Sequence, residues 1–278
     1  MSYLWRVKSV KLIYGFPEEL WVKVLESAWS SGEEDSAFIA SILRKYNITL
    51  GSKILDLGCG IGRIAIRLAL LGYKVLGIDI SSLCIKKAYE YAMRYNVEDK
   101  VILEVGDYKR LKEIDGVEKY KPFDAVLLIF TLTWSNTEEV ISIFKNINDI
   151  AKDKGILIIQ EPCREFYTSI LTYTPFNSFK WIDEKTLCMT TRRLDHLRGM
   201  VSVETWIYKK VSNEELKLIK SIRRRHYIPT LKEYVEVLKE ANWKVVEVMH
   251  RHITRIEPIH LHRGAQSYIS PYVIAVKQ

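Results

Sequence analysis

Short apolar runs alternate with amphipathic segments along most of this chain. From Gly51 onward, runs with the length of buried strands are separated by segments in which apolar residues recur at helical spacing. Strands that alternate with helices in this way predict a parallel sheet with helices on both faces. The predicted strands are Lys53–Leu57, Lys74–Ile78, Val101–Val105, Phe123–Phe130 and Gly155–Gln160, and the predicted helices lie at about 61–71, 82–95 and 136–151.

The regions on either side of this alternation have other patterns. Residues 16–46 carry apolar residues at helical spacing after Pro17, which predicts two helices that cap the core. After Glu161 the alternation stops, and two β-like stretches predict an antiparallel hairpin or small sheet. These stretches are Thr186–Leu194 and Met200–Tyr208.

The alternation resumes toward the C-terminus with a helix at about 229–241 and strands at Lys244–Val248 and Pro271–Val276. We therefore predict an α/β fold in four parts. They are an N-terminal helical cap (1–50), an α/β core (51–162), an insertion (163–228) and a C-terminal part that completes the core sheet (229–278).

A glycine-rich segment follows the first predicted strand and precedes a helix. It reads Asp56-Leu-Gly58-Cys59-Gly60-Ile-Gly62. Glycines let the backbone turn tightly and approach a ligand, and ligands of open α/β sheets bind outside the carboxyl ends of the strands. The spacing Gly60-x-Gly62-x-x-Ala65 also satisfies the dinucleotide fingerprint, so a nicotinamide or flavin protein is an alternative.

Acidic residues at the ends of the first three predicted strands favour a different ligand. Asp56 lies two residues before the first glycine, where a carboxylate repels a pyrophosphate but suits an amine or a sulfonium. Asp79 ends the second strand, in a position suited to the hydroxyls of a ribose. Asp107 and Tyr108 follow the third strand, where a carboxylate accepts from an adenine amine while a ring packs nearby.

With this combination the chain resembles the class I S-adenosylmethionine-dependent methyltransferases, well over residues 51–161 and more loosely over 229–278. The resemblance implies a doubly wound, Rossmann-like sheet of seven strands, six parallel and the last reversed. It implies S-adenosylmethionine as methyl donor and S-adenosylhomocysteine as product. The cofactor-binding residues it implies are Asp56, Gly58, Cys59, Gly60, Gly62, Asp79, Ile80, Asp107, Tyr108 and Phe130.

The insertion and the segment after it resemble the small-molecule, glycine N-methyltransferase-like branch of that family. The resemblance implies that the insertion is an antiparallel lid over a small acceptor, which is methylated on O or N by in-line displacement. A general base is needed only for an acceptor that is protonated at working pH, and we take His226 and Tyr227 as candidates. The expected acceptor-binding residues are Thr131, Trp134, Arg198, His250 and His252.

The charge distribution bears on the acceptor. The chain has a formal net charge of +8, but residues 1–163 carry 22 basic and 22 acidic residues, whereas residues 164–278 carry 20 and 12. The run Arg223–Arg225 is typical of a solvated helix end, and a nucleic-acid patch is the rival interpretation. A small anionic acceptor explains the same surplus. An RNA methyltransferase and a non-catalytic nucleotide-binding α/β protein remain as alternatives.

Two other patterns carry alternative chemistry. Cys163 follows Pro162 as the nucleophile of cytosine-C5 methyltransferases does, but it follows the fifth strand instead of the fourth, which indicates a chain exit. The pairs His250/His252 and His260/His262 would suit a shared metal ion. Because methyl transfer needs no metal, we expect none.

The remaining composition predicts the environment. Four dispersed cysteines without a Cys-x-x-Cys pair indicate a reducing compartment, and no apolar run approaches the length that spans a bilayer. We therefore expect a cytoplasmic protein that does not bind a membrane. The scarcity of Gln beside abundant Lys, Glu and Ile is typical of a thermophile. The sequence predicts no particular oligomeric state.

Overall fold

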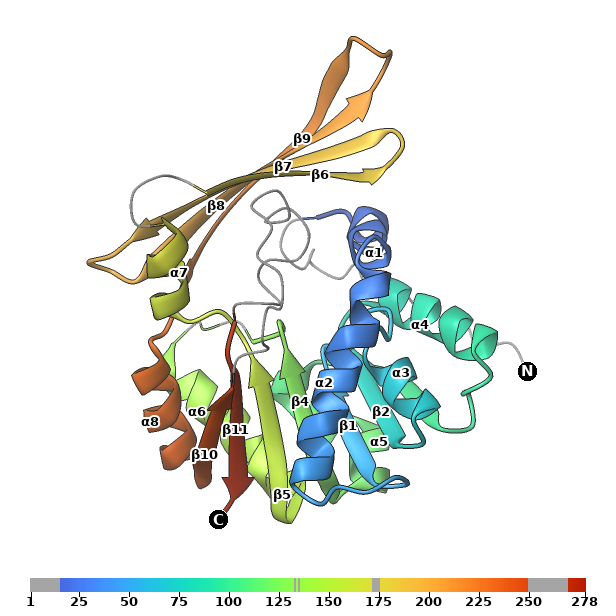
Figure 1. The fold of residues 1–278 in the computed structure, drawn as a ribbon, viewed down its shortest axis with the longest axis vertical. Coiled ribbons are helices and arrows are strands. Elements are labelled where there is room, and N and C mark those ends of the chain that lie inside the picture. The colour runs from blue at the N-terminus through green and yellow to red at the C-terminus, as the bar shows by residue number, and fades with distance from the viewer. Residues whose placement is uncertain (1–15, 133, 135, 172–175, 250–269) are drawn as a thin grey trace.

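The computed structural model describes residues 16–132, 134, 136–171, 176–249 and 270–278. Its core is a seven-stranded sheet in the order β10-β11-β5-β4-β1-β2-β3 (Figure 1). β1 pairs in parallel with both β2 and β4, and only β11 runs antiparallel to its neighbours. This confirms the predicted sheet. Its strands are β1 Lys53–Leu57, β2 Lys74–Asp79, β3 Val101–Val105, β4 Phe123–Ile129, β5 Ala151–Gln160, β10 Trp243–Met249 and β11 Tyr272–Lys277.

Helices cover both faces of this sheet. Successive residues of a strand point to opposite faces, so Ile54 of β1 packs under one set of helices and Leu55 under the other. On the first face lie α1 Glu18–Glu26, η2 Trp29–Ser31, α2 Gly32–Lys45, α3 Ala65–Leu70 and α4 Ser82–Arg94. On the second face lie η3 Tyr108–Glu113, α5 Asp115–Tyr120, α6 Thr137–Ile150 and α8 Leu231–Glu240.

A second sheet, which we call the small sheet, lies over the edge of the core sheet where its parallel strands end (Figure 1). It is antiparallel, in the order β6 Phe176–Asp183, β7 Thr186–Asp195, β8 Met200–Lys210 and β9 Leu216–Tyr227. The chain reaches it through α7 Arg164–Leu171, which follows β5. The predicted antiparallel insertion is confirmed in kind, with two strands more than the pattern indicated.

The run Arg223–Arg225 lies within β9, so its interpretation as a helix end is wrong. Arg223 pairs with Glu204 and Arg224 with Val203 in the β8–β9 register. Because side chains alternate along a strand, Arg224 faces one side of the small sheet and its neighbours face the other. A run of identical charges in the sequence is thus divided between two surfaces.

The helical cap is joined to the core by a buried ion pair. Asp35 of α2 is fully buried, and its carboxylate contacts the guanidinium of Arg63, which follows the glycine segment. The same guanidinium donates to Ser31 Oγ at 3.2 Å. Next to it, the ring of Trp29 stacks on Tyr91 of α4 with centroids 3.8 Å apart. The cap therefore reaches the core through the segment that begins α3.

Removing one partner of this ion pair should destabilise the protein strongly. Asp35→Ala should lower the free energy of unfolding by about 3–5 kcal/mol, because the Arg63 charge would remain in a mostly buried site. Urea denaturation measures the change. Asp183→Ala, which breaks the exposed pair with Lys23, is the control and should cost less than about 1 kcal/mol. Equal costs for the two variants would contradict the assigned role of the Asp35–Arg63 pair.

Candidate functional site

The glycine loop after β1, residues 58–62, has a conformation that requires glycine. Gly58 and Gly62 have φ angles of +73° and +80°, in the left-handed region. A Cβ atom on Gly58 would lie 2.3 Å from the side chain of Thr131, and one on Gly62 would lie 2.7 Å from Ile66. The loop therefore packs against the residues that follow β4 and against α3. A side chain at Gly58 or Gly62 would displace the loop.

Asp79, the last residue of β2, holds this loop from the side. Its Oδ2 accepts the N–H of Gly60 at 2.9 Å, and its Oδ1 accepts the N–H of Ser81 at 2.9 Å. Burial raises the pKa of Asp79, and the nearby Glu18 carboxylate adds to that rise. A carboxylate oxygen can accept more than one hydrogen bond, so both oxygens of Asp79 keep acceptor capacity toward a diol.

Asp56 lies beneath the loop. It is 3% exposed, and its carboxylate accepts the N–H of Ala65 at the start of α3. Burial raises its pKa from 3.8 to about 7, an effect that the Arg63 charge opposes. Cys59 is also buried, and burial raises the pKa of its thiol. Ile80, by contrast, is 37% exposed beside Asp79.

The residues that follow β3 and β4 lie at the same edge of the core sheet as the glycine loop. Asp107 Oδ1 caps η3 by accepting the N–H of Lys109 at 3.0 Å. The Tyr108 hydroxyl donates to the Thr131 carbonyl at 3.3 Å, which places this ring between the exits of β3 and β4. Phe130 follows β4 with a φ of +54°. The structure thus brings the predicted cofactor residues to one edge of the sheet. Their contacts with a cofactor stay a prediction.

Glu161 is a residue of this edge that the sequence analysis did not single out. It follows β5 and is 7% exposed. Its Oε1 accepts the N–H groups of Thr131 and Leu132, the latter at 2.6 Å. Burial raises its pKa from 4.5 to about 8, against the effect of these two backbone donors. Its signal in the sequence was the same as for the other acids, since it too ends a buried strand.

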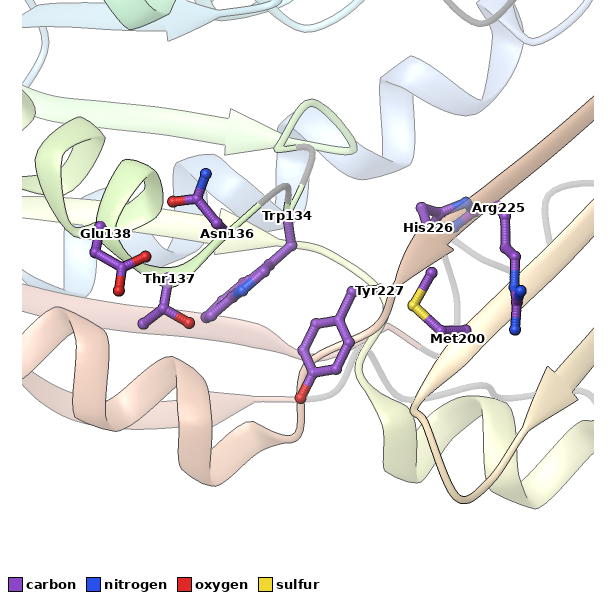
Figure 2. A pocket seen from close by; sticks show the side chains of 8 residues that line it. All are labelled: Trp134, Asn136, Thr137, Glu138, Met200, Arg225, His226 and Tyr227. Atoms are coloured by element: carbon purple, nitrogen blue, oxygen red, sulfur yellow. The ribbon is translucent and has the colours of Figure 1, made fainter.

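A cavity of about 630 Å³ opens between the core and the small sheet (Figure 2). The core side is formed by the segment after β4, and the other side by the ends of β8 and β9 that lie nearest the core. Figure 2 shows the Tyr227 ring between these two sides, and its centroid lies 6.2 Å from that of Trp134. The lining residues are Trp134, Asn136, Thr137, Glu138, Met200, Arg225, His226 and Tyr227.

The two candidate bases lie at this cavity in different states. The Tyr227 hydroxyl donates to Glu233 Oε1 and accepts from Arg164 Nη2 at 2.6 Å. Burial and the Glu233 carboxylate raise the pKa of Tyr227. For His226, burial and the guanidinium groups of Arg224 and Arg192 lower the pKa to about 4, so its imidazole is neutral at physiological pH.

Arg198 is less closely associated with the cavity. It lies in the exposed turn after β7 and donates to Asp195 Oδ2 at 3.0 Å. The same carboxylate oxygen lies 3.4 Å from Nη2 of the cavity residue Arg225, so Arg198 is at the rim. The predicted acceptor residues His250 and His252, and the second histidine pair at 260 and 262, lie outside the described residues.

The part of the chain that the structure describes has neither a metal-binding cluster nor a membrane-spanning helix. Within it, no cluster of three or more His, Cys, Asp or Glu side chains has a geometry that would hold a metal ion. Within the same part, no helix has both the length and the apolar character that a membrane span requires.

Comparison with known proteins agrees with this geometry. Residues 48–227 match a family model described as a methyltransferase domain. YqeM of Bacillus subtilis (strain 168) is 33% identical over 108 residues, which are 38% of this chain and 40% of YqeM. The 23S rRNA (uracil(1939)-C(5))-methyltransferase RlmD of Chromobacterium violaceum is 22% identical over 209 residues, 69% of this chain and 41% of RlmD. The chain thus spans less than half the length of these curated relatives.

The fold also has solved counterparts. CalS10 of Micromonospora echinaspora, an amino pentose methyltransferase solved with S-adenosylmethionine bound, has a TM-score of 0.66 to this structure. The similarity covers 96% of this chain and 99% of CalS10 at 15% sequence identity. At that identity the comparison shows the fold alone.

The two buried carboxyl groups of this site should make the stability of the ligand-free protein depend on pH. Their folded pKa values of about 7 and about 8 exceed the ordinary values of 3.8 and 4.5, so the folded state holds extra protons between those limits. The free energy of unfolding should therefore fall as pH rises from about 4 to about 8, by up to about 1.4 kcal/mol per pH unit for each group.

Urea denaturation at pH 5, 7 and 9 measures this slope. Glu161→Gln should remove the upper part of the slope and stabilise the protein at pH 9, because a neutral amide has no buried charge to desolvate. Asp56→Asn should reduce the slope below about pH 7, where Glu161 also contributes to it. A wild-type slope that persists in both variants would show that these carboxyl groups do not cause it.

Proposed function

Because this chain belongs to the class I S-adenosylmethionine-dependent methyltransferases, we propose that it methylates an O or N nucleophile of a small anionic molecule. The acceptor would lie between the core and the small sheet. One observation carries the proposal: the glycine loop and the cavity meet at the exit of β4, where Thr131 touches Gly58 and Trp134 lines the cavity. A donor and an acceptor bound on either side of that exit would be neighbours.

The residues at the glycine loop suit the cofactor. S-adenosylmethionine supplies an activated methyl group on a sulfonium. Asp79 would hold its ribose hydroxyls, since both carboxylate oxygens keep acceptor capacity. Asp107 with Tyr108, which follow β3, would lie at the adenine. The chain's own task is then to align the acceptor, for which orientation supplies ~7–11 kcal/mol in favourable cases.

The small sheet supports an anionic acceptor. In its register Arg192 and Arg224 both pair with Val203, and His226 pairs with Val201, so these three side chains project from one face. The two guanidinium groups are close enough to His226 to lower its pKa. His226 itself lines the cavity. Arg225 lines the same side of the cavity, and the guanidinium groups near His226 add positive charge behind it, while Glu138 lies on the core side.

RNA methylation is a second candidate, favoured by the similarity to RlmD and by the exposed basic residues of β9. Arg223 is largely exposed, but its Nε lies 3.4 Å from Glu204 Oε1, and Arg225 lies 3.4 Å from Asp195. These carboxylates offset part of the charge that would meet a phosphate backbone. The geometry therefore supports the small anionic acceptor better.

Cofactor binding is tested first. Calorimetry should show binding of S-adenosylmethionine and S-adenosylhomocysteine but not of NAD. Asp79→Ala should weaken S-adenosylhomocysteine binding ~100-fold or more, because hydrogen bonds to a charged group contribute about 1.5–3 kcal/mol each. The control is Asp124→Ala, since Asp124 also accepts a backbone N–H, from Lys53, but at the opposite edge of the sheet. Binding of NAD alone would overturn the proposal, and unchanged affinity in Asp79→Ala would overturn the ribose position.

The acceptor class is tested by labelled methyl transfer into acidic metabolite, RNA and protein fractions of a host lysate. Label should enter the acidic metabolites. Arg224→Gln should lower kcat/KM for that fraction ~10–100-fold, whereas the adjacent Arg223→Gln, on the other face of β9, should have little effect. Label found only in RNase-sensitive material would favour RNA. In that case Arg223→Gln should reduce the salt dependence of RNA binding by about one phosphate contact.

A further inference from the structure

Glu161 is a buried carboxyl group to which the proposed function assigns no task. It lies at the carboxyl end of β5, next to the exit of β4 in the sheet order. Burial of an ionisable group costs free energy unless hydrogen bonds compensate for the lost water. Its only hydrogen bonds within the described part of the chain are those from Thr131 and Leu132, and both end on Oε1. Glu161 is therefore hydrogen-bonded to the segment after β4 through Oε1.

These bonds extend the β4–β5 ladder beyond the last strand pair. The ladder ends where Ile129 pairs with Gln160. After that, the Phe130 N–H donates to the Gln160 carbonyl at 2.9 Å, and the next two N–H groups donate to the Glu161 side chain. Three consecutive backbone N–H groups after β4 thus donate to the two residues at the end of β5, Gln160 and Glu161. Phe130, with its positive φ, lies inside this held segment.

The held segment forms the boundary between the two halves of the site. The Thr131 side chain occupies the space beside Gly58 of the glycine loop, and its carbonyl accepts from Tyr108. Trp134, three residues after Thr131, lines the cavity between the core and the small sheet. A shift of Thr131 and Leu132 would therefore move the cavity wall relative to the glycine loop.

We propose that Glu161 is a positioning residue for methyl transfer, in which Oε1 holds the backbone of Thr131 and Leu132 and so keeps the cavity wall aligned with the glycine loop. This inference rests on the proposed function. It assigns Glu161 no contact with the acceptor. Because alignment of the reacting groups is the main contribution of such a site, a small displacement of the wall reduces the rate sharply.

The role has a pH signature. The ionised carboxylate makes stronger hydrogen bonds to N–H donors than the neutral acid does. Burial raises the pKa of Glu161 to about 8, so the rate should fall as pH falls through that value. The Glu161 carboxylate raises the pKa of Tyr234 of α8, so these two groups lie close together, and the backbone donors of Thr131 and Leu132 lower the pKa of Glu161.

The test compares Glu161→Gln and Glu161→Ala with wild type. Single-turnover methyl transfer from labelled S-adenosylmethionine into the acidic metabolite fraction is measured from pH 6 to 9, together with S-adenosylhomocysteine affinity and the melting temperature. The control is Glu104→Gln, since Glu104 also accepts a backbone N–H, from Gly116 at 3.0 Å, but on β3, away from the cavity.

Glu161→Ala should bind S-adenosylhomocysteine within about threefold of wild type and transfer methyl groups ~100-fold more slowly. Glu161→Gln should keep the rate within about fivefold, because its amide oxygen accepts the same two N–H groups. It should also lose the step near pH 8 that wild type and Glu104→Gln show.

Full activity in Glu161→Ala would overturn the inference. So would a Glu161→Gln variant as slow as Glu161→Ala, since that result would assign proton acceptance to the carboxylate instead of positioning. If Glu161→Ala fails to fold, the Glu161→Gln rate and its pH profile decide alone. A wild-type protein that binds no S-adenosylhomocysteine would remove the proposed function as well, whereas normal binding with an unchanged Glu161→Ala rate removes only this role.

Discussion

The parallel pairing of β1 with both β2 and β4 determines where the residues of the candidate site meet. The chain leaves β1 toward β2 and β3 on one side, and later returns to place β4 and β5 on the other. Because parallel strands end at one edge, the residues after all five strands meet there. The reversal of direction at β1 separates them into two groups. Asp79 and Asp107 lie on one side of the glycine loop, and Thr131 and Glu161 lie on the other.

The core sheet was predictable because its strands are short, apolar and separated by helices. A parallel strand buried on both faces has few polar positions to obscure its pattern, and β1 and β3 have the bounds that the pattern indicated. The small sheet was predictable only in its middle. β9 mixes apolar and basic residues and carries three consecutive arginines before its last two residues, so its charge concealed its period. β9 is an edge strand, and its outward positions are free to be charged.

The residues of the candidate site also divide into those that could be predicted from the sequence and those that could not. The acids at the ends of β1, β2 and β3 belong to a recognisable linear order, so they were found from the sequence. Glu161 also follows a buried strand, but it lies outside that order, and its hydrogen bonds with Thr131 and Leu132 join positions about 30 residues apart along the chain. The contact of the Tyr227 hydroxyl with Arg164, 63 residues earlier in the chain, was hidden for the same reason. Residue type and spacing identify candidate groups, but hydrogen-bond partners decide which atoms remain available.

Helix α1 touches both parts of the molecule that would enclose the ligands. Leu25 lies 3.1 Å from where a Cβ of Gly60 would stand, and Lys23 pairs with Asp183 of the small sheet at 2.6 Å. Phe16, just before the helix, packs with Ile207 and Ile222 of the same sheet. A coupling free energy between the cofactor site and the acceptor site that acts through α1 is reciprocal by thermodynamic linkage. If cofactor binding strengthens acceptor binding by some factor through this helix, acceptor binding strengthens cofactor binding by the same factor, and release of the spent cofactor becomes coupled to departure of the product.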